Sequence, residues 1–127
     1  MKTAQELKIW LEQFDLLHAV NADDDDLDEM LDARDGSDFE TDYLRLLALV
    51  PDEEELGLSE DDMALNNSIS RLAFVKARAF ADSELASYVA DDFDLLARSL
   101  QAKISDPWLE KLFEQYKSGH FPCGKLL

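Results

Sequence analysis

The side chains with the widest range of chemistry in this chain are its two histidines and its single cysteine. His120 and Cys123 stand three positions apart, a spacing that could give two zinc ligands or a thiol nucleophile beside a base. A structural zinc site needs four ligands, and the other histidine, His18, falls in a distant segment. The four glycines are too few for a phosphate-binding loop. We therefore expect no catalytic residue, no metal and no cofactor.

The aspartates that begin at position 23 could bind calcium, but their spacing does not match a calcium-binding loop. Counted from Asp24, the sixth position is Glu29, where such a loop needs a glycine. Counted from Asp32, the third position is Arg34, which cannot bind a cation. The abundance of acids in this segment therefore requires a different interpretation.

Four acids of this segment form one stripe on a helix, because they recur at i, i+3, i+4 and i+7: Asp25, Asp28, Glu29 and Asp32. Like charges at this spacing cost about 0.2–0.5 kcal/mol per pair. A helix that tolerates this cost is a candidate contact surface, and a strongly solvated face is the alternative. A second dense group consists of Asp52, Glu53, Glu54, Glu55, Asp61 and Asp62. We expect both groups to contact a partner.

The negative charge of the chain is confined to its first half. Residues 1–62 contain 21 Asp and Glu against four Lys and Arg, whereas residues 63–127 contain eight of each. The formal net charge of -17 therefore comes entirely from residues 1–62. Such a field attracts basic proteins and repels nucleic acid and anionic membranes. We expect a basic protein partner, no direct nucleic-acid binding and no membrane binding.

The elements that must position these acids are helices, and we expect a single all-α domain over residues 1–127. Gly and Pro are scarce, at four and three, and the hydrophobic content of 46% supports a folded core. Four capping patterns mark helix starts: Thr3 with Glu6, Ser37 with Glu40, Ser59 with Asp62, and Asp106 before Pro107. Together with the apolar spacing they predict a bundle of five or six helices. No apolar run approaches ~18 residues and no signal peptide is visible, so the cytoplasm is expected.

The boundaries of two helices depend on weaker patterns. In the first helix, Ile9, Leu16 and Val20 form a second apolar stripe, which predicts either a helix sandwiched in the core or a contact with a partner. The sequence Asn-Asn-Ser at 66–68 contains poor helix formers and predicts a break or bend there.

The segment at about residues 69–81 is predicted to be the central buried helix, because its apolar residues surround most of the helix. Asp92 falls in the apolar stripe of the next helix, where an unpaired carboxylate would be very costly. We expect it to form a structural ion pair with a cation of the central helix, for which the candidates are Lys76, Arg71 and Arg78. The tail at residues 120–127 is apolar and is expected to fold back on the bundle.

In size, charge and helical content the chain resembles the acidic all-helical immunity proteins that protect bacteria from the toxins of their neighbours. This resemblance implies a protein that neutralises a basic toxin, such as a nuclease. Two alternatives stay open: a nucleic-acid mimic that inhibits a DNA- or RNA-binding protein, and a small regulatory homo-oligomer, such as a homodimer, whose acids only confer solubility. The apolar residues Ile9, Leu16, Val20 and Met30 could anchor a toxin, which favours the immunity protein.

Overall fold

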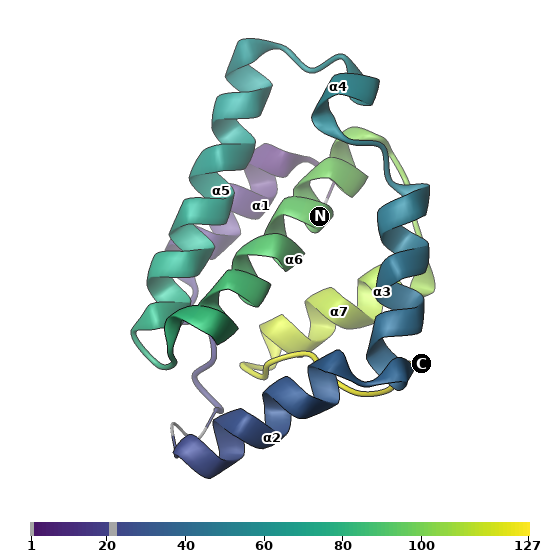
Figure 1. Cartoon of the computed structure of the whole chain (residues 1–127). Coiled ribbons are helices and arrows are strands. Elements are labelled where there is room, and N and C mark those ends of the chain that lie inside the picture. Colours follow the sequence, from purple (N-terminus) through teal and green to yellow (C-terminus); the bar gives the residue numbers. More distant parts are fainter. Residues whose placement is uncertain (1, 21–22) are drawn as a thin grey trace.

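The computed structural model describes residues 2–20 and 23–127, and all regular structure in these residues is helical (Figure 1). Six helices have ten or more residues, and a seventh is a single turn. Their bounds are α1 (Ala4–Gln13), α2 (Asp24–Asp35), α3 (Ser37–Leu49), α4 (Glu53–Leu56), α5 (Glu60–Arg78), α6 (Ser83–Gln101) and α7 (Pro107–Lys117). The predicted all-α bundle of five or six helices is confirmed, with α4 as the additional turn. Among the described helices none combines the length and the hydropathy that crossing a membrane requires.

Most helices begin where a capping side chain predicts. Thr3, Ser59 and Asp106 each accept a hydrogen bond from a backbone N–H in the first turn of the helix that follows, at 2.9–3.1 Å. The predicted cap at Ser37 is wrong by one position, because α3 already includes Ser37 and its N-cap is Gly36, which has no side chain to accept.

The helix α1 is shorter than its apolar pattern predicts. It ends at Gln13, and the chain then turns with Leu17 at a positive φ of 61°. The amine of Lys76 donates to the backbone oxygens of Glu12 and Phe14, at 3.1 and 2.6 Å, and so satisfies carbonyls at the end of α1. Leu16 and Leu17 lie in this turn and are fully buried in the core.

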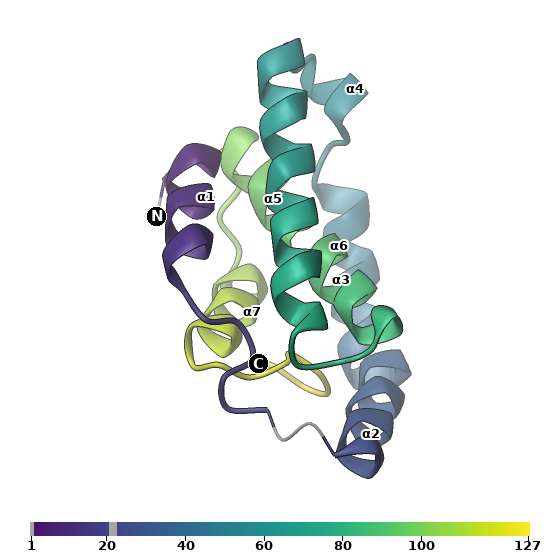
Figure 2. The same cartoon turned by 90° about the vertical axis from the view of Figure 1, so that its left-hand side faces the viewer.

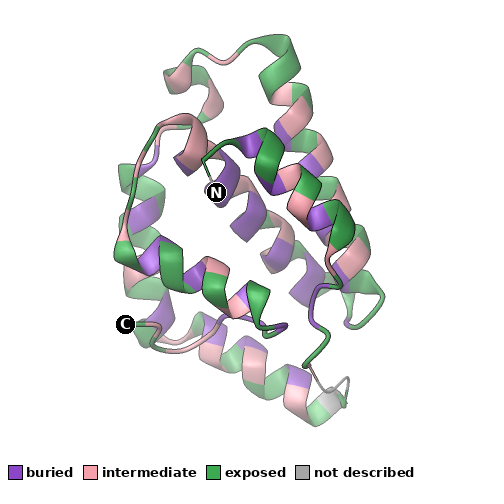
Figure 3. Ribbon diagram, turned by 180° about the vertical axis from the view of Figure 1, so that it is seen from behind, coloured by how far each residue is buried: buried purple, intermediate pink, exposed green. Residues whose placement is uncertain are grey.

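The most buried helix is α6 rather than the segment at residues 69–81. Nine of the 19 residues of α6 are buried, against four of the 19 in α5. The buried stripe of α5 is narrow, with Ala73 and Ala77 packed against α6, while Val75 is 60% exposed and Phe80 is 37% exposed. Figure 3 shows the buried positions gathered on α6 and on the inner sides of its neighbours. A helical wheel could not predict this, because apolar side chains on the outer flank of α5 have no partner helix.

The predicted break at residues 66–68 is also wrong, because α5 is continuous through them. Asn66 is fully buried, and its side-chain amide forms two reciprocal 2.9 Å hydrogen bonds with that of Gln101 on α6. A satisfied amide pair replaces the local backbone hydrogen bonds that make asparagine a poor helix former. The tertiary contact therefore overrides the intrinsic helix propensity.

The acidic first half of the chain is spread over several sides of the bundle, because α1 packs against α5 and α6 while α2, α3 and α4 lie elsewhere (Figure 1). Figure 1 places α2 at one end of the molecule and α4 at the other, with α3 running between them, and Figure 2 shows the same separation after a quarter turn. The C-terminal tail crosses beside α2, where the Gly124 N–H donates to the carbonyl of Ala33 at 3.3 Å. Phe121 of this tail is buried.

Candidate functional site

The four acids of the predicted stripe on α2 are all exposed: Asp25, Asp28, Glu29 and Asp32. Leu27 and Leu31 are buried on the opposite face of the helix. Asp23 caps α2 by accepting from the Asp25 N–H at 3.0 Å, whereas Asn21, which the sequence predicts as a cap for this helix, lies outside the described residues. Within the described part of the chain, none of the four exposed carboxylates forms an ion pair. We refer to these four residues as the α2 stripe.

The second predicted acid group lies at the opposite end of the molecule, around α4 and the beginning of α5 (Figure 1). Asp52 caps α4 by accepting from the Glu55 N–H at 2.8 Å, and Ser59 caps α5. Asp61 and Asp62 lie in the first turn of α5, where the helix dipole favours negative charge, and the single turn of α4 contains Glu53, Glu54 and Glu55. The two acid groups therefore do not converge on one face.

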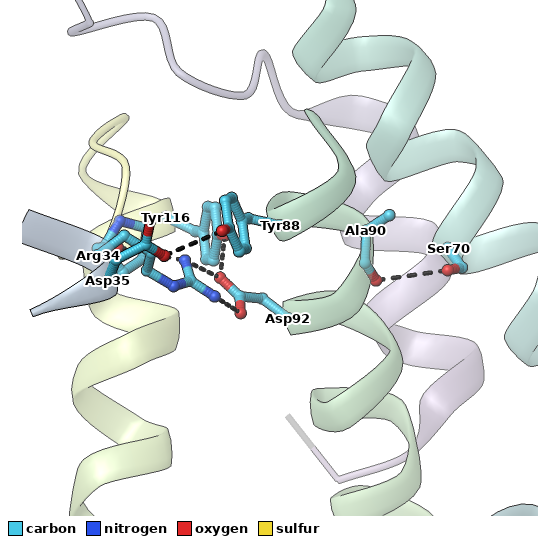
Figure 4. Close-up of polar contacts among 8 residues, drawn as sticks. Arg34, Asp35, Ser70, Tyr88, Ala90, Asp92 and Tyr116 are labelled. Carbon is cyan, nitrogen blue, oxygen red and sulfur yellow. Dashed lines mark hydrogen bonds and ion pairs between the residues drawn. The ribbon is translucent and has the colours of Figure 1, made fainter. Parts of the chain in front are cut away.

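A buried ion pair joins α2 to the rest of the bundle. Both amino groups of the Arg34 guanidinium donate to the carboxylate of Asp92, one of them at 2.9 Å, and the Tyr116 hydroxyl donates to the same carboxylate (Figure 4). Arg34 is 3% exposed, and Asp92 and Tyr116 are fully buried. One carboxylate on α6 thus connects α2 and α7.

The predicted partners of Asp92 are wrong, because Lys76, Arg71 and Arg78 all lie on α5. Figure 4 shows α5 on the far side of α6, where the Ser70 hydroxyl donates to the Ala90 carbonyl at 3.3 Å. The cations of α5 have other positions: Lys76 holds the end of α1, Arg78 donates to the Ala81 carbonyl at 2.7 Å, and Arg71 is exposed.

Arginine suits this buried position because its guanidinium is planar and can be stacked as well as hydrogen bonded. Four aromatic rings surround its central carbon at 4.1–5.3 Å, from Phe39, Tyr43, Tyr88 and Phe121. A sequence signal for this role exists, because Arg34 follows Leu27 and Leu31 at i+7 and i+3 and so falls on the apolar face of α2.

Burial acts on the pKa values of all three groups in this network. Burial raises the pKa of Asp92 above its ordinary value, and the charge and hydrogen bonds of Arg34 oppose that effect. For Arg34, burial is the largest single effect and acts to lower the pKa, but the charge and hydrogen bonds of Asp92 together with the nearby tyrosines raise the pKa above the ordinary value, so the guanidinium stays charged. Burial and the charge of Asp92 raise the pKa of Tyr116 well above its ordinary value, so its hydroxyl remains a donor.

A groove of about 170 Å³ lies beside this ion pair, between α2, α3 and α6. Its lining consists of Arg34, Asp35, Phe39, Glu40, Tyr43, Leu44 and Tyr88. The Tyr88 hydroxyl donates to the Asp35 carboxylate at 2.9 Å, which fixes that carboxylate at the rim (Figure 4). Leu44 is 54% exposed despite its size. We refer to this feature as the tyrosine groove.

A second cavity of about 370 Å³ lies between α6, α7 and the side of α1 that carries Leu7. Half of its lining is aliphatic or aromatic, and its charged residues are Asp106, Glu110, Glu114 and Lys117. This cavity is in the half of the chain that carries no net charge.

The residues with potential for catalysis or metal binding are not brought together. His120 is exposed, and burial raises the pKa of the Cys123 thiol, which disfavours the nucleophilic thiolate. The ring of His18 lies edge-on to the ring of Phe14, with ring centroids 5.5 Å apart. Over residues 2–20 and 23–127, no three His, Cys, Asp or Glu side chains are grouped so that they could hold a metal ion.

The apolar anchors expected on the first helix do not form a common surface. Leu16 is 1% exposed and belongs to the core, Val20 is half-buried, and only Ile9 is largely exposed, at 47%. The exposed leucines on α3 are instead Leu44, Leu47 and Leu49. Sequence spacing predicts Leu47 to face inward and does not identify Leu44 as a surface residue.

One comparison with known proteins gives a match. A family model described as Immunity protein PIM1 matches residues 6–123, a range that includes most of α1 and the whole of α2 to α7. No curated protein and no solved structure matches the chain.

Proposed function

Because the chain belongs to the PIM1 family of immunity proteins, we propose that it neutralises a basic toxin, such as a nuclease, with the α2 stripe as the main contact. The family accounts for toxin neutralisation in general and for a role as an inhibitor rather than a catalyst. The basic character of the toxin and the position of the contact are inferred from charge. The observation that carries the inference is the exposed position of Asp28, Glu29 and Asp32.

These three acids have no local structural reason to be present. They lie beyond the first turn of α2, where the helix dipole no longer favours negative charge, and Asp32 lies in the last turn, where the dipole opposes it. Asp28 and Asp32 are also four residues apart, a like-charge spacing that destabilises a helix. Acids that weaken their own helix are best explained by an interaction outside the chain.

The acids around α4 have a different explanation. Asp52 caps α4, and Asp61 and Asp62 lie in the first turn of α5, so these three acids stabilise local structure regardless of any partner. A standard interface buries roughly 800 Å² per partner, about a ninth of the 6965 Å² of accessible surface of this chain. One such interface does not reach both ends of the molecule. We infer that Asp52, Glu53, Glu54, Glu55, Asp61 and Asp62 contribute to the long-range field that attracts the toxin.

Stopped-flow association with the cognate toxin, used as a catalytically inactive variant, tests this proposal. The triple variant D28N/E29Q/D32N should associate at least about tenfold more slowly at low salt, and the difference should shrink as salt increases. Its free energy of unfolding should be unchanged or higher, because like-charge repulsion is removed.

The matched control is E53Q/E54Q/D61N, which removes the same number of charges at the other end of the molecule. A fall in association rate that is equal for both variants would show a general field effect and no contact at α2, and an unchanged rate in the first variant would refute the proposal. Light scattering of the free protein separates toxin binding from the homo-oligomer interpretation, which requires a dimer without toxin.

A further inference from the structure

We propose that the tyrosine groove holds one lysine or arginine side chain of the toxin and is the anchor point of the complex. This inference rests on the proposed function and adds the position and the chemistry of the central contact. The groove is the place where the acids of α2 meet an exposed apolar residue and fixed aromatic rings, which are the components of an interface hot spot.

The groove continues the surface that the α2 stripe begins. Asp35 follows Asp28 and Asp32 at i+7 and i+3, so the three carboxylates lie along one face of α2 and the last of them forms the groove rim. Glu40 supplies a second rim carboxylate from α3 and is exposed. A toxin surface that docks on the α2 stripe therefore reaches the groove without leaving the acidic face.

The charge of the lining is negative even though Arg34 is part of it. The guanidinium of Arg34 is neutralised by its bidentate pair with Asp92 on the inner side, where its hydrogen bonds to that carboxylate are made. Asp35 and Glu40 have no cationic partner within the described residues. The two rim carboxylates are thus available to a cation from outside, and an anionic ligand is disfavoured.

The size of the groove suits one amphipathic side chain. A volume of about 170 Å³ is well below the ~300–1,000 Å³ of pockets that hold small molecules. Lysine and arginine both carry an apolar stem below the charged group. The stem would contact Leu44 and the ring of Tyr43, and the charge would meet the carboxylates of Asp35 and Glu40.

The lining of the groove is already held by contacts within the chain. Tyr88 holds Asp35, and Tyr43 packs on Phe39 and Trp108 with ring centroids 5.7 and 6.3 Å apart. A preformed site loses less conformational entropy on binding than a flexible one. The larger cavity at α6 and α7 matches a basic partner less well, because two of its carboxylates, Asp106 and Glu114, already pair with Arg45 and Lys111, and because Lys117 also lies in its lining.

Dissociation kinetics of the complex with the inactive toxin test the groove separately from the stripe. Loss of a desolvated charge pair increases the dissociation rate, whereas loss of peripheral charge mainly reduces the association rate. The variant D35N/E40Q should dissociate at least about tenfold faster, and the amide oxygen introduced at position 35 can still accept from Tyr88. Its control, E110Q/E114Q, removes two rim carboxylates at the other cavity and should change the rate less than about twofold.

Two exposed leucines of α3 provide a test of the apolar part of the site and its control. L44A should accelerate dissociation, whereas L49A, at a leucine 51% exposed on the other flank of α3, should not. A photo-crosslinking amino acid at position 44 should label a Lys- or Arg-containing peptide of the toxin, as identified by mass spectrometry.

Equal effects of D35N/E40Q and E110Q/E114Q, or crosslinking at position 49 alone, would refute the groove as the anchor point and leave the proposed function standing. Absence of any complex with the unmodified chain would refute the proposed function itself.

Discussion

The ion pair of Arg34 and Asp92 shows how a single buried residue can secure a highly charged helix. Asp92 is fully buried and accepts from Arg34 and Tyr116, so removal of one partner leaves an uncompensated buried charge. We expect R34M and D92L each to lower the free energy of unfolding by roughly 3–5 kcal/mol. The double variant R34M/D92L should recover most of that loss, because it leaves no unpaired charge. Urea denaturation of the four proteins gives the coupling energy, and additive losses would contradict the interpretation.

Lys103 is a position where a substitution should stabilise the protein. It has φ = 57° directly after α6, where the Ile104 N–H donates to the Ser99 carbonyl at 2.9 Å and the Lys103 N–H donates to the Leu100 carbonyl at 3.2 Å. This is the helix-ending motif in which glycine is preferred. K103G should raise the free energy of unfolding by about 1 kcal/mol, as thermal denaturation can measure, and K103A should not. A K103A variant as stable as K103G would show that backbone strain is not the cause.

The need for a partner at Asp92 could be predicted from sequence, but the identity of that partner could not. The apolar stripe of its helix required a cation, and Arg34, Lys76, Arg71 and Arg78 were all available in the chain. Only the folded structure, which brings the C-terminal end of α2 to Asp92 on α6, selects Arg34. The same limit applies to Leu44, which became a site residue only once the faces of α3 were known.

At the level of helices, the start of α7 depends on a surface ion pair. Arg45 of α3 donates to both oxygens of Asp106, at 2.9 and 3.2 Å, and this contact holds the pKa of Asp106 below its ordinary value despite some burial. Because the folded pKa is lowered, the stabilisation is present above the unfolded value of about 3.9 and is lost as the pH falls through the folded value.

We therefore expect D106N to lose roughly 0.2–1 kcal/mol of stability at neutral pH, a typical value for a surface pair. Asparagine also caps helices well, so the loss reports mainly on the charge. The difference in the free energy of unfolding between D106N and wild type should be constant above about pH 5 and should disappear at lower pH, as denaturation at a series of pH values can show. A difference that persists in acid would indicate a packing effect in place of the ion pair.

Helix starts were more predictable than helix ends in this chain. Thr3, Ser59 and Asp106 act locally, so their effect is visible in sequence. The end of α1 and the continuity of α5 depend on Lys76 and on the Asn66–Gln101 pair, which are contacts between residues at least 35 positions apart. Local patterns carry no information about such contacts.

For the whole molecule, the net charge of -17 sets the response to salt. Self-repulsion destabilises the folded state, and salt screens it. Raising NaCl from about 0.01 M to 0.15 M shortens the screening length from ~30 to ~8 Å and should therefore increase the free energy of unfolding. Over the same range the association rate with the toxin should fall. Urea denaturation and stopped-flow kinetics at matched salt concentrations check both trends, and a stability that falls with salt would contradict the first.

The asymmetry of charge between the two halves of the chain was evident in the sequence, but its arrangement in space was not. Residues 23–32 and 52–62 are close in sequence and lie at opposite ends of the bundle, because the straight helix α3 separates them (Figure 1). This separation is the reason why we propose that the α2 stripe contacts the toxin and that the acids around α4 contribute to the long-range field.

The way in which α2 is attached to the bundle determines where local unfolding of this helix is expected. Its C-terminal end is tied to the rest of the protein through Arg34, Asp35 and the carbonyl of Ala33, and the side chains of Leu27 and Leu31 are buried. The exposed face of α2 has none of the described ion pairs, so we expect its amide hydrogens to exchange through local openings that leave α5 and α6 intact. A bound toxin would close these openings, so slowed exchange would mark out its footprint along the helix.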